Sequence, residues 1–275
     1  MAHKFSLAHL TVLGWNPVEM IYNAHAIGYD YVSVRTISMG ISRESDFDIS
    51  KNKKLFSDMR EAMNETGMEI YDIELARIAD GVDVRDYEAP FEAAARLGAK
   101  GTISSIWTDN KPFYMEQFAL LCDLAARYNL TVNLEFPTWA NVWDLKGVLE
   151  VLETVKKPNA AVMVDTLHVY RSRVSHEELA AIPKELLNLM HICDGPAEIP
   201  PRTDKDSLIF TGRDARYYVG EGAIDIAGMV KLARADTVLS IELPHVERVA
   251  KYGFFEHARR CLVTAKEYLA KNGVR

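Results

Sequence analysis

The stretch TVNLEF at residues 131–136 shows the pattern on which the rest of the chain is built. A short apolar run ends in an acidic residue, and the alternation of a strand places Asn133 and Glu135 on one face and Val132 and Leu134 on the other. Three later runs end in the same way: AAVMVDTLH at 160–168, LNLMHICD at 187–194 and TVLSIEL at 237–243. Each run predicts a strand that carries a polar, reactive side chain at or near its carboxyl end.

Strand-like and helix-like stretches alternate along the whole chain. We expect strands at 5–12, 29–37, 68–78, 100–107, 130–136, 159–168, 187–195 and 237–244, with helices between them and after the last one. Such alternation is typical of βαβ units and a parallel sheet. Eight units in 275 residues predict an α/β protein with one domain, residues 1–275, closed into a (β/α)₈ TIM barrel. The alternative is an open doubly wound sheet, but the turn LTVLGWNP after the first strand lacks the GxGxxG pattern.

The composition is that of an ordinary globular protein, with 48% hydrophobic and 26% charged residues. The net charge of −7 argues against nucleic acid or an anionic membrane as the main partner. The three cysteines, Cys122, Cys193 and Cys261, form no CxxC pair, which fits a reducing compartment better than a disulfide framework. We find no signal-peptide pattern and no uninterrupted apolar run of about 18 residues, so we expect a cytoplasmic protein that does not span a membrane.

Four polar side chains fall at the ends of the last four predicted strands: Glu135, Asp165, His191 and Glu242. Barrel active sites lie at the carboxyl ends of the strands, so consecutive strands should bring these residues together. Three carboxylates and an imidazole would repel one another without a cation, and we predict that they bind one divalent metal ion. Oxygen donors with one imidazole favour Mn²⁺, with Mg²⁺, Co²⁺ or Zn²⁺ as alternatives. Taken singly, each residue also has a structural explanation, such as a helix cap for Asp165, and Asp194 could either orient His191 or cap a loop.

Other strand ends carry further side chains that could line a pocket: His9, Arg35, Glu74 and Trp107. A rim ion pair between Arg35 and Glu74 is the structural alternative. The stretch 196–220 is expected to be irregular and long enough to act as a lid. Within it, Arg202 is the candidate for binding a substrate oxygen or an anion, and Arg213 and Arg216 are alternatives that we expect to be solvated.

Several of these motifs are also those of a known family. They are the Glu in NLEF, the D-x-x-H of Asp165–His168, the H-x-x-D of His191–Asp194, the G-E-G of residues 220–222 and the I-E-L of the last strand. Over its whole length the chain resembles the xylose isomerase-like superfamily of sugar isomerases and epimerases. That superfamily includes ketose 3-epimerases, inosose dehydratases and apurinic endonucleases. The resemblance implies that Glu135, Asp165, His191 and Glu242 hold one divalent metal and that His168 contacts a substrate oxygen.

The residue types suit one class of chemistry. A metal that chelates a carbonyl and the neighbouring hydroxyl acidifies the adjacent C–H bond and stabilises an enediolate. If Glu135 removes a proton from one face and Glu242 returns one to the other, or the reverse, the result is epimerisation; return to the neighbouring carbon gives isomerisation. We therefore expect a metal-dependent isomerase or epimerase of a sugar or cyclitol, with a small polyhydroxylated substrate.

Three other functions share the scaffold. Loss of a β-hydroxyl from the same intermediate would make the protein a dehydratase of the inosose or dehydroshikimate type. A DNA-repair nuclease would need additional histidines at the ends of strands two to four, which this acidic chain lacks. A non-catalytic sugar-binding barrel is the last alternative, against which the complete ligand set argues. Dimers and tetramers are common among the proteins that the chain resembles, so a homo-oligomer is an option on which the sequence is silent.

Overall fold

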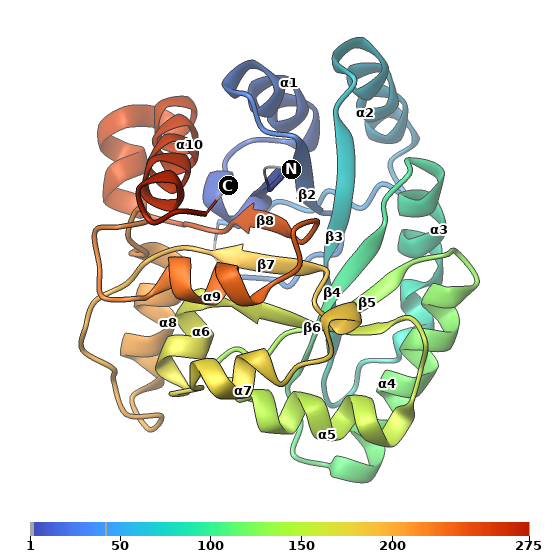
Figure 1. Ribbon diagram of the computed structural model, residues 1–275. Coiled ribbons are helices and arrows are strands. Elements are labelled where there is room, and N and C mark those ends of the chain that lie inside the picture. The colour runs from blue at the N-terminus through green and yellow to red at the C-terminus, as the bar shows by residue number, and fades with distance from the viewer. Residues whose placement is uncertain (1–2, 42, 275) are drawn as a thin grey trace.

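Eight parallel strands close into a barrel in the computed structural model, which describes residues 3–41 and 43–274. The strands follow the order of the chain around the barrel, and the first pairs with the last (Figure 1). They are β1 Phe5–Ala8, β2 Tyr31–Arg35, β3 Glu69–Ile78, β4 Gly101–Ile106, β5 Thr131–Leu134, β6 Ala160–Asp165, β7 Leu189–Ile192 and β8 Val238–Ile241. The predicted fold class, a (β/α)₈ TIM barrel, is confirmed.

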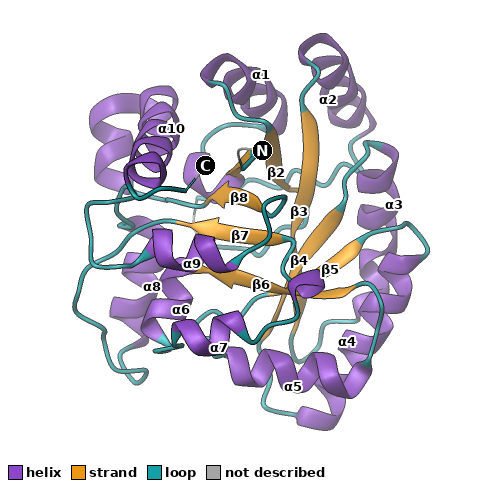
Figure 2. Cartoon of the chain, viewed as in Figure 1, coloured by secondary structure: helices purple, strands orange, loops and turns teal. Residues whose placement is uncertain are grey.

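Helices surround the barrel on its outer face (Figure 2). They are α1 Pro17–Ile27, α2 Lys53–Thr66, α3 Glu88–Arg96, α4 Lys111–Ala126, α5 Leu145–Val155, α6 Thr166–Arg171, α7 His176–Ala180, α8 Lys205–Asp214, α9 Ile226–Leu232 and α10 Val246–Lys271. Three 3₁₀ turns accompany them: η1 His9–Val12, η2 Val84–Tyr87 and η3 Lys184–Leu186. A capping box formed by Ser175 and Glu178 starts α7. Within the described residues, no helix combines the length and apolar character that a membrane crossing requires.

Several predicted elements are longer than the observed ones, and three differences from the prediction have a clear local reason. The first strand stops at Ala8, because the residues that follow form η1. The sixth strand stops at Asp165, whose carboxylate accepts hydrogen bonds from the backbone N–H groups of Leu167 and His168 and so starts α6. The stretch 196–220 is only partly irregular, because Asp204 caps α8 within it.

Two separate cores fill the protein. The larger one lies between the strands and the helices, and a smaller one inside the barrel consists of Leu75, Ile103, Met163, Leu189 and Val238. Polar side chains share the barrel interior with this small core, and several have buried atoms without a hydrogen-bond partner among the described residues: Ser6, Asp72, Asn133 and Ser240. Asp72 is completely buried, and neither of its oxygens has a partner. The barrel interior is therefore polar beneath the strand ends, and an ionised Asp72 would be costly there.

Replacing Asp72 by Asn should stabilise the protein increasingly as the pH rises. Burial and then the nearby Glu74 carboxylate raise the pKa of Asp72 from 3.8 to about 8. A carboxyl whose pKa is higher in the folded than in the unfolded state reduces stability as the pH rises from the unfolded to the folded pKa. Urea unfolding should show that Asp72→Asn increases the free energy of unfolding more at pH 8 than at pH 5. Equal effects at both pH values, or a change matched by the exposed control Asp86→Asn, would contradict this account.

Candidate metal centre

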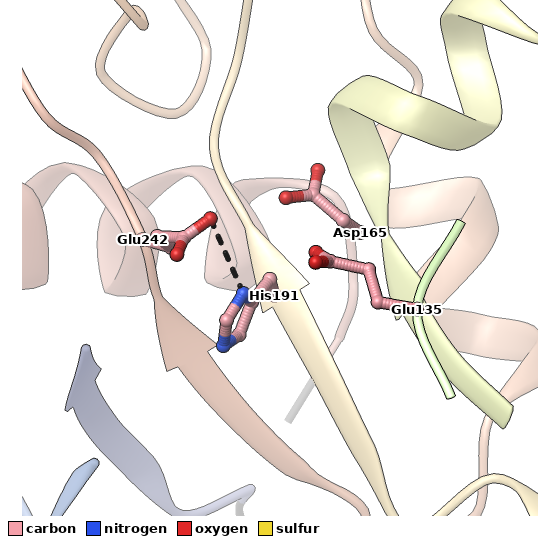
Figure 3. Close-up of side chains that lie close together, drawn as sticks. All are labelled: Glu135, Asp165, His191 and Glu242. Carbon is pink, nitrogen blue, oxygen red and sulfur yellow. Dashed lines mark ion pairs between the residues drawn. The ribbon is translucent and has the colours of Figure 1, made fainter. Parts of the chain in front are cut away.

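The four predicted ligands lie together at the carboxyl end of the barrel. Asp165 is the last residue of β6, His191 lies within β7, and Glu135 and Glu242 directly follow β5 and β8. One possible ligand atom from each lies within 4.8 Å of those of the other three. Figure 3 shows the three carboxylates and the imidazole projecting from their strands into one common space. The parallel strands thus produce the convergence that the sequence predicts, while the roles of the residues remain predictions.

The cluster is shielded from solvent, and the least buried of the four residues, Glu135, is only 9% exposed. Neither ring nitrogen of His191 has a hydrogen-bond partner among the described residues. Its Nδ1 lies 3.3 Å from Oε2 of Glu242 (Figure 3). Buried polar atoms normally have hydrogen-bond partners. An imidazole that meets a carboxylate at Nδ1 and leaves Nε2 without a partner among the described residues therefore fits a site built for a cation.

A fifth charged side chain, Arg216, reaches the same site. Its Nη1 lies 2.6 Å from Oδ2 of Asp165, and its Nη2 lies 2.7 Å from Oε2 of Glu242. Its Nε donates to the carbonyl oxygen of Gly212 at 2.7 Å, and the side chain is almost completely buried. The expectation that Arg216 is solvated is therefore wrong. No strand end or periodic pattern marks it in the sequence, because it follows α8 in a short connection that bridges back to Pro244.

The charges in the cluster perturb one another. Burial opposes ionisation of Asp165 and Glu242, but the Arg216 guanidinium outweighs it and holds the pKa of both carboxyls below the usual range. Burial, followed by the charges of Glu242 and Asp165, raises the pKa of Glu135 to about 8. Burial disfavours a charge on His191, yet the neighbouring carboxylates of Glu242 and Glu135 raise its pKa to about 10.

These shifts make the cluster electrically neutral in two different states. Near pH 7 without metal, Glu135 and His191 hold protons, so the charges of Asp165 and Glu242 are balanced by those of His191 and Arg216. With a divalent cation and both protons released, three carboxylates are balanced by the cation and Arg216. Uncompensated charge is very unfavourable in a buried site, so the residues present fit a cation of charge two.

A cavity of about 50 Å³ opens beside the cluster. Its wall includes four of the six residues predicted to contact substrate: Arg35, Glu74, Trp107 and His168. Ile41 and Trp139, from the segments after β2 and β5, and Arg213 of α8 also line it.

Two of these wall positions have a defined local role. Arg35 Nη2 lies 2.8 Å from Oε2 of Glu74, so the ion pair considered as the structural alternative is present and forms part of the wall. His168 lies edge-on to Trp139 with ring centroids 4.9 Å apart. Burial lowers the pKa of His168 to about 4, so its imidazole is neutral near pH 7.

The structure does not place the other two predicted contacts, His9 and Arg202, in this wall. His9 Nδ1 accepts the backbone N–H of Arg35 at 3.1 Å, and its Nε2 lies 2.9 Å from the carbonyl oxygen of Trp15, so both nitrogens are used. Arg202 donates to the carbonyl oxygens of Thr138 and Ala140. Its guanidinium also lies over the ring of Trp143, 4.1 Å from the ring centroid.

Asp194 caps a loop and is not a hydrogen-bond partner of His191. Its carboxylate accepts the backbone N–H groups of Gly220, Gly222 and Ile224. A side chain at position 222 would collide with Asp194 and with the backbone of Gly195, which explains why glycine occupies this end of the G-E-G motif.

Binding of Mn²⁺ should release protons, because Glu135 and His191 hold them in the metal-free site. A cation needs the deprotonated forms, and the pKa values of about 8 and about 10 lie above neutral pH. The apparent affinity should therefore increase with pH between pH 6 and pH 8. Calorimetric titrations at pH 7 in buffers of different ionisation enthalpy should show release of about two protons per ion. Binding that is independent of pH and of buffer would contradict the charge balance.

Replacing Arg216 by Gln should strongly destabilise the metal-free protein. The change leaves Asp165 and Glu242 without their buried cation, and breaking such a pair costs about 3–5 kcal/mol of unfolding free energy. Added Mn²⁺ should restore part of the lost unfolding free energy. The control is Arg85→Gln, which removes a solvent-exposed ion pair with Asp83 and should cost less than about 1 kcal/mol. Equal effects of the two changes in urea unfolding would contradict the assigned role of Arg216.

Comparison with known structures gives similar folds at low sequence identity. IolI protein, solved with a bound zinc atom, is 19% identical with a TM-score of 0.80 over 98% of this chain and 99% of its own. D-allulose 3-epimerase from Methylomonas sp., in complex with D-allulose, is 16% identical with a TM-score of 0.69 over 98% and 99%. The 3-keto-D-glucoside 4-epimerase YcjR from E. coli is 15% identical with a TM-score of 0.69 over 95% and 99%.

Matches at such identities establish the fold and leave the activity of this chain open. A search of curated proteins gave no significant match. The sequence model of one family, described as the xylose isomerase-like TIM barrel, matches residues 21–271, which is most of the chain. The chain therefore belongs to the xylose isomerase-like TIM barrel family.

Proposed function

We propose that the protein is a metal-dependent isomerase or epimerase of a sugar or cyclitol. The observation that carries the proposal is the buried cluster of Glu135, Asp165, His191 and Glu242, whose charges balance around one divalent cation. Support also comes from the printed functions of similar structures, two of which are sugar epimerases. Three oxygen donors and one nitrogen favour Mn²⁺, and the zinc bound to IolI makes Zn²⁺ the main alternative.

Proton transfer is assigned to Glu135 and Glu242. When bound, the metal would act as a Lewis acid on a substrate carbonyl and lower the pKa of the neighbouring C–H bond. The two glutamates project from different strands toward the common space (Figure 3). One can therefore remove a proton from one face of a substrate carbon while the other returns a proton to the opposite face, which inverts the configuration.

Arg216 and His168 prepare the site for this transfer. Arg216 holds Oε2 of Glu242 at 2.7 Å, which fixes that carboxylate in one orientation and favours its ionised form. The neutral imidazole of His168 lines the cavity and can exchange a hydrogen bond with a substrate hydroxyl without adding charge. The faces of Trp107 and Trp139 offer apolar surface for the C–H groups of a sugar ring.

Solvent deuterium exchange should identify the reaction. With Mn²⁺ added, a screen of ketoses and cyclitols should reveal substrates that take up deuterium at the carbon next to the carbonyl, followed by NMR. Glu135→Gln and Glu242→Gln should each reduce the exchange rate by about 10²–10⁴-fold, the range typical of a lost general acid or base.

Two controls make the outcome interpretable. The exposed Glu150→Gln should exchange at the wild-type rate, and metal analysis of each variant separates loss of metal from loss of proton transfer. Wild-type exchange in both Gln variants would refute the assignment. A product with a new ultraviolet-absorbing enone would instead assign a dehydratase.

A further inference from the structure

A second, larger cavity adjoins the one beside the metal cluster. It measures about 540 Å³, within the range of small-molecule sites. Its walls are mainly apolar and come from η1, the loop after β2, α8 and the start of α10; they include Leu13, Ile209, Val246, Val249 and Phe254. We call it the outer cavity and the 50 Å³ space the inner cavity. Leu10, Ile41 and Arg213 line both, so these three side chains form the partition between them.

A monosaccharide does not fit within the inner cavity as it stands. The inner cavity holds about four water molecules, since each water needs about 10–15 Å³ measured in this way. A monosaccharide is larger than that, so one bound at the cluster would displace part of the cavity wall or extend beyond it, and a shift of Ile41 or Arg213 is one way to make room. Such a shift joins the two cavities. A substrate that displaces either side chain would therefore contact the outer cavity.

Arg213 has hydrogen-bonding capacity to spare at this junction. No described residue accepts a hydrogen bond from its guanidinium or forms an ion pair with it. The guanidinium carbon lies 5.9 Å from the ring centroid of Trp139. The other arginines near the site differ in this respect, because Arg43 pairs with Asp214 and Arg216 pairs with Asp165. A half-buried donor without a partner is suited to an oxygen of a ligand.

The far wall of the outer cavity depends on two glycines. Gly253 has a φ of +75°, and this break in α10 lets the chain turn before Phe254. A side chain at Gly14 would come within 2.3 Å of the Phe254 ring, so glycine at position 14 leaves room for that ring. Phe254 also packs against Trp15 with ring centroids 6.0 Å apart. The apolar wall is therefore a firmly packed surface next to the sugar site.

We propose that the outer cavity is a second substrate subsite that binds an apolar substituent attached through oxygen to the polyhydroxylated unit. The favoured substrate class is thus an aryl or alkyl glycoside whose sugar ring carries a keto group for the proposed proton transfer. In such a substrate Arg213 donates to the linking oxygen and the apolar group lies against Val249 and Phe254. This inference rests on the proposed function, because the polyhydroxylated unit is assigned to the inner cavity.

Binding of two matched glycosides tests the inference. Phenyl β-D-glucoside and methyl β-D-glucoside would be titrated into the full-length protein with Mn²⁺ present, followed by calorimetry. The phenyl compound should bind at least about tenfold more tightly, the order expected when several apolar carbon atoms leave water. Val249→Trp, which fills the outer cavity, should abolish this preference and leave binding of the methyl compound unchanged. The control Val263→Trp, at an exposed position of the same helix, should retain the preference for the phenyl compound.

Other results would contradict the second subsite or distinguish its failure from failure of the proposed function. Ala250→Phe is a second filling variant in case Val249→Trp does not fold. Equal binding of the two glycosides, no binding of either, or a preference that survives the filling variants would overturn the second subsite. If the wild-type protein exchanges deuterium into no free sugar, the proposed function is refuted. A preference for the phenyl glucoside that Val249→Trp removes would still support the outer cavity as a binding site.

Discussion

The ion pairs of Arg216 with Asp165 and Glu242 are the interaction on which the site depends. Two buried carboxylates cannot remain ionised at this depth without a cation, and Arg216 supplies one permanently. A third carboxylate, Glu135, then has no permanent partner and holds a proton until another cation arrives. With all three carboxylates ionised and His191 neutral, the cluster therefore lacks two positive charges, and a divalent ion would supply them.

The fold keeps this arrangement in register. Parallel pairing places Asp165 opposite His191, and His191 opposite Ser240, two residues before Glu242. Asp194 fixes the loop that carries the G-E-G motif, and the bridge between Asp194 and Tyr217 holds the chain next to Arg216. Helix α8 closes the cavity, because Gly212 allows the ring of Trp139 to approach its backbone. The four-residue cluster, the Arg216 guanidinium and part of the cavity wall therefore belong to one connected structure.

The sequence was sufficient for the barrel and for the four convergent side chains, because both follow from short-range patterns. Alternation within a strand determines which face Glu135 occupies, and the order of the strands determines its neighbours. Arg216 was expected to be solvated, which is wrong because its environment comes from tertiary packing, and the same kind of packing keeps His9 and Arg202 out of the cavity wall. Arg216 is buried by segments distant in sequence, and His9 is withdrawn from the cavity by backbone groups of Arg35 and Trp15. The extra helix α8 was missed because its apolar face is weak and prolines precede it.

The central claim is that these four side chains hold one divalent ion beside Arg216. Anomalous diffraction from crystals grown with Mn²⁺ tests it most directly. The account predicts one peak within about 2.0–2.6 Å of an oxygen of Glu135, Asp165 and Glu242 and of a nitrogen of His191, with Arg216 still paired. No peak at the cluster in crystals that bind Mn²⁺ elsewhere, or a peak that leaves His191 and Glu135 unbound, would contradict it.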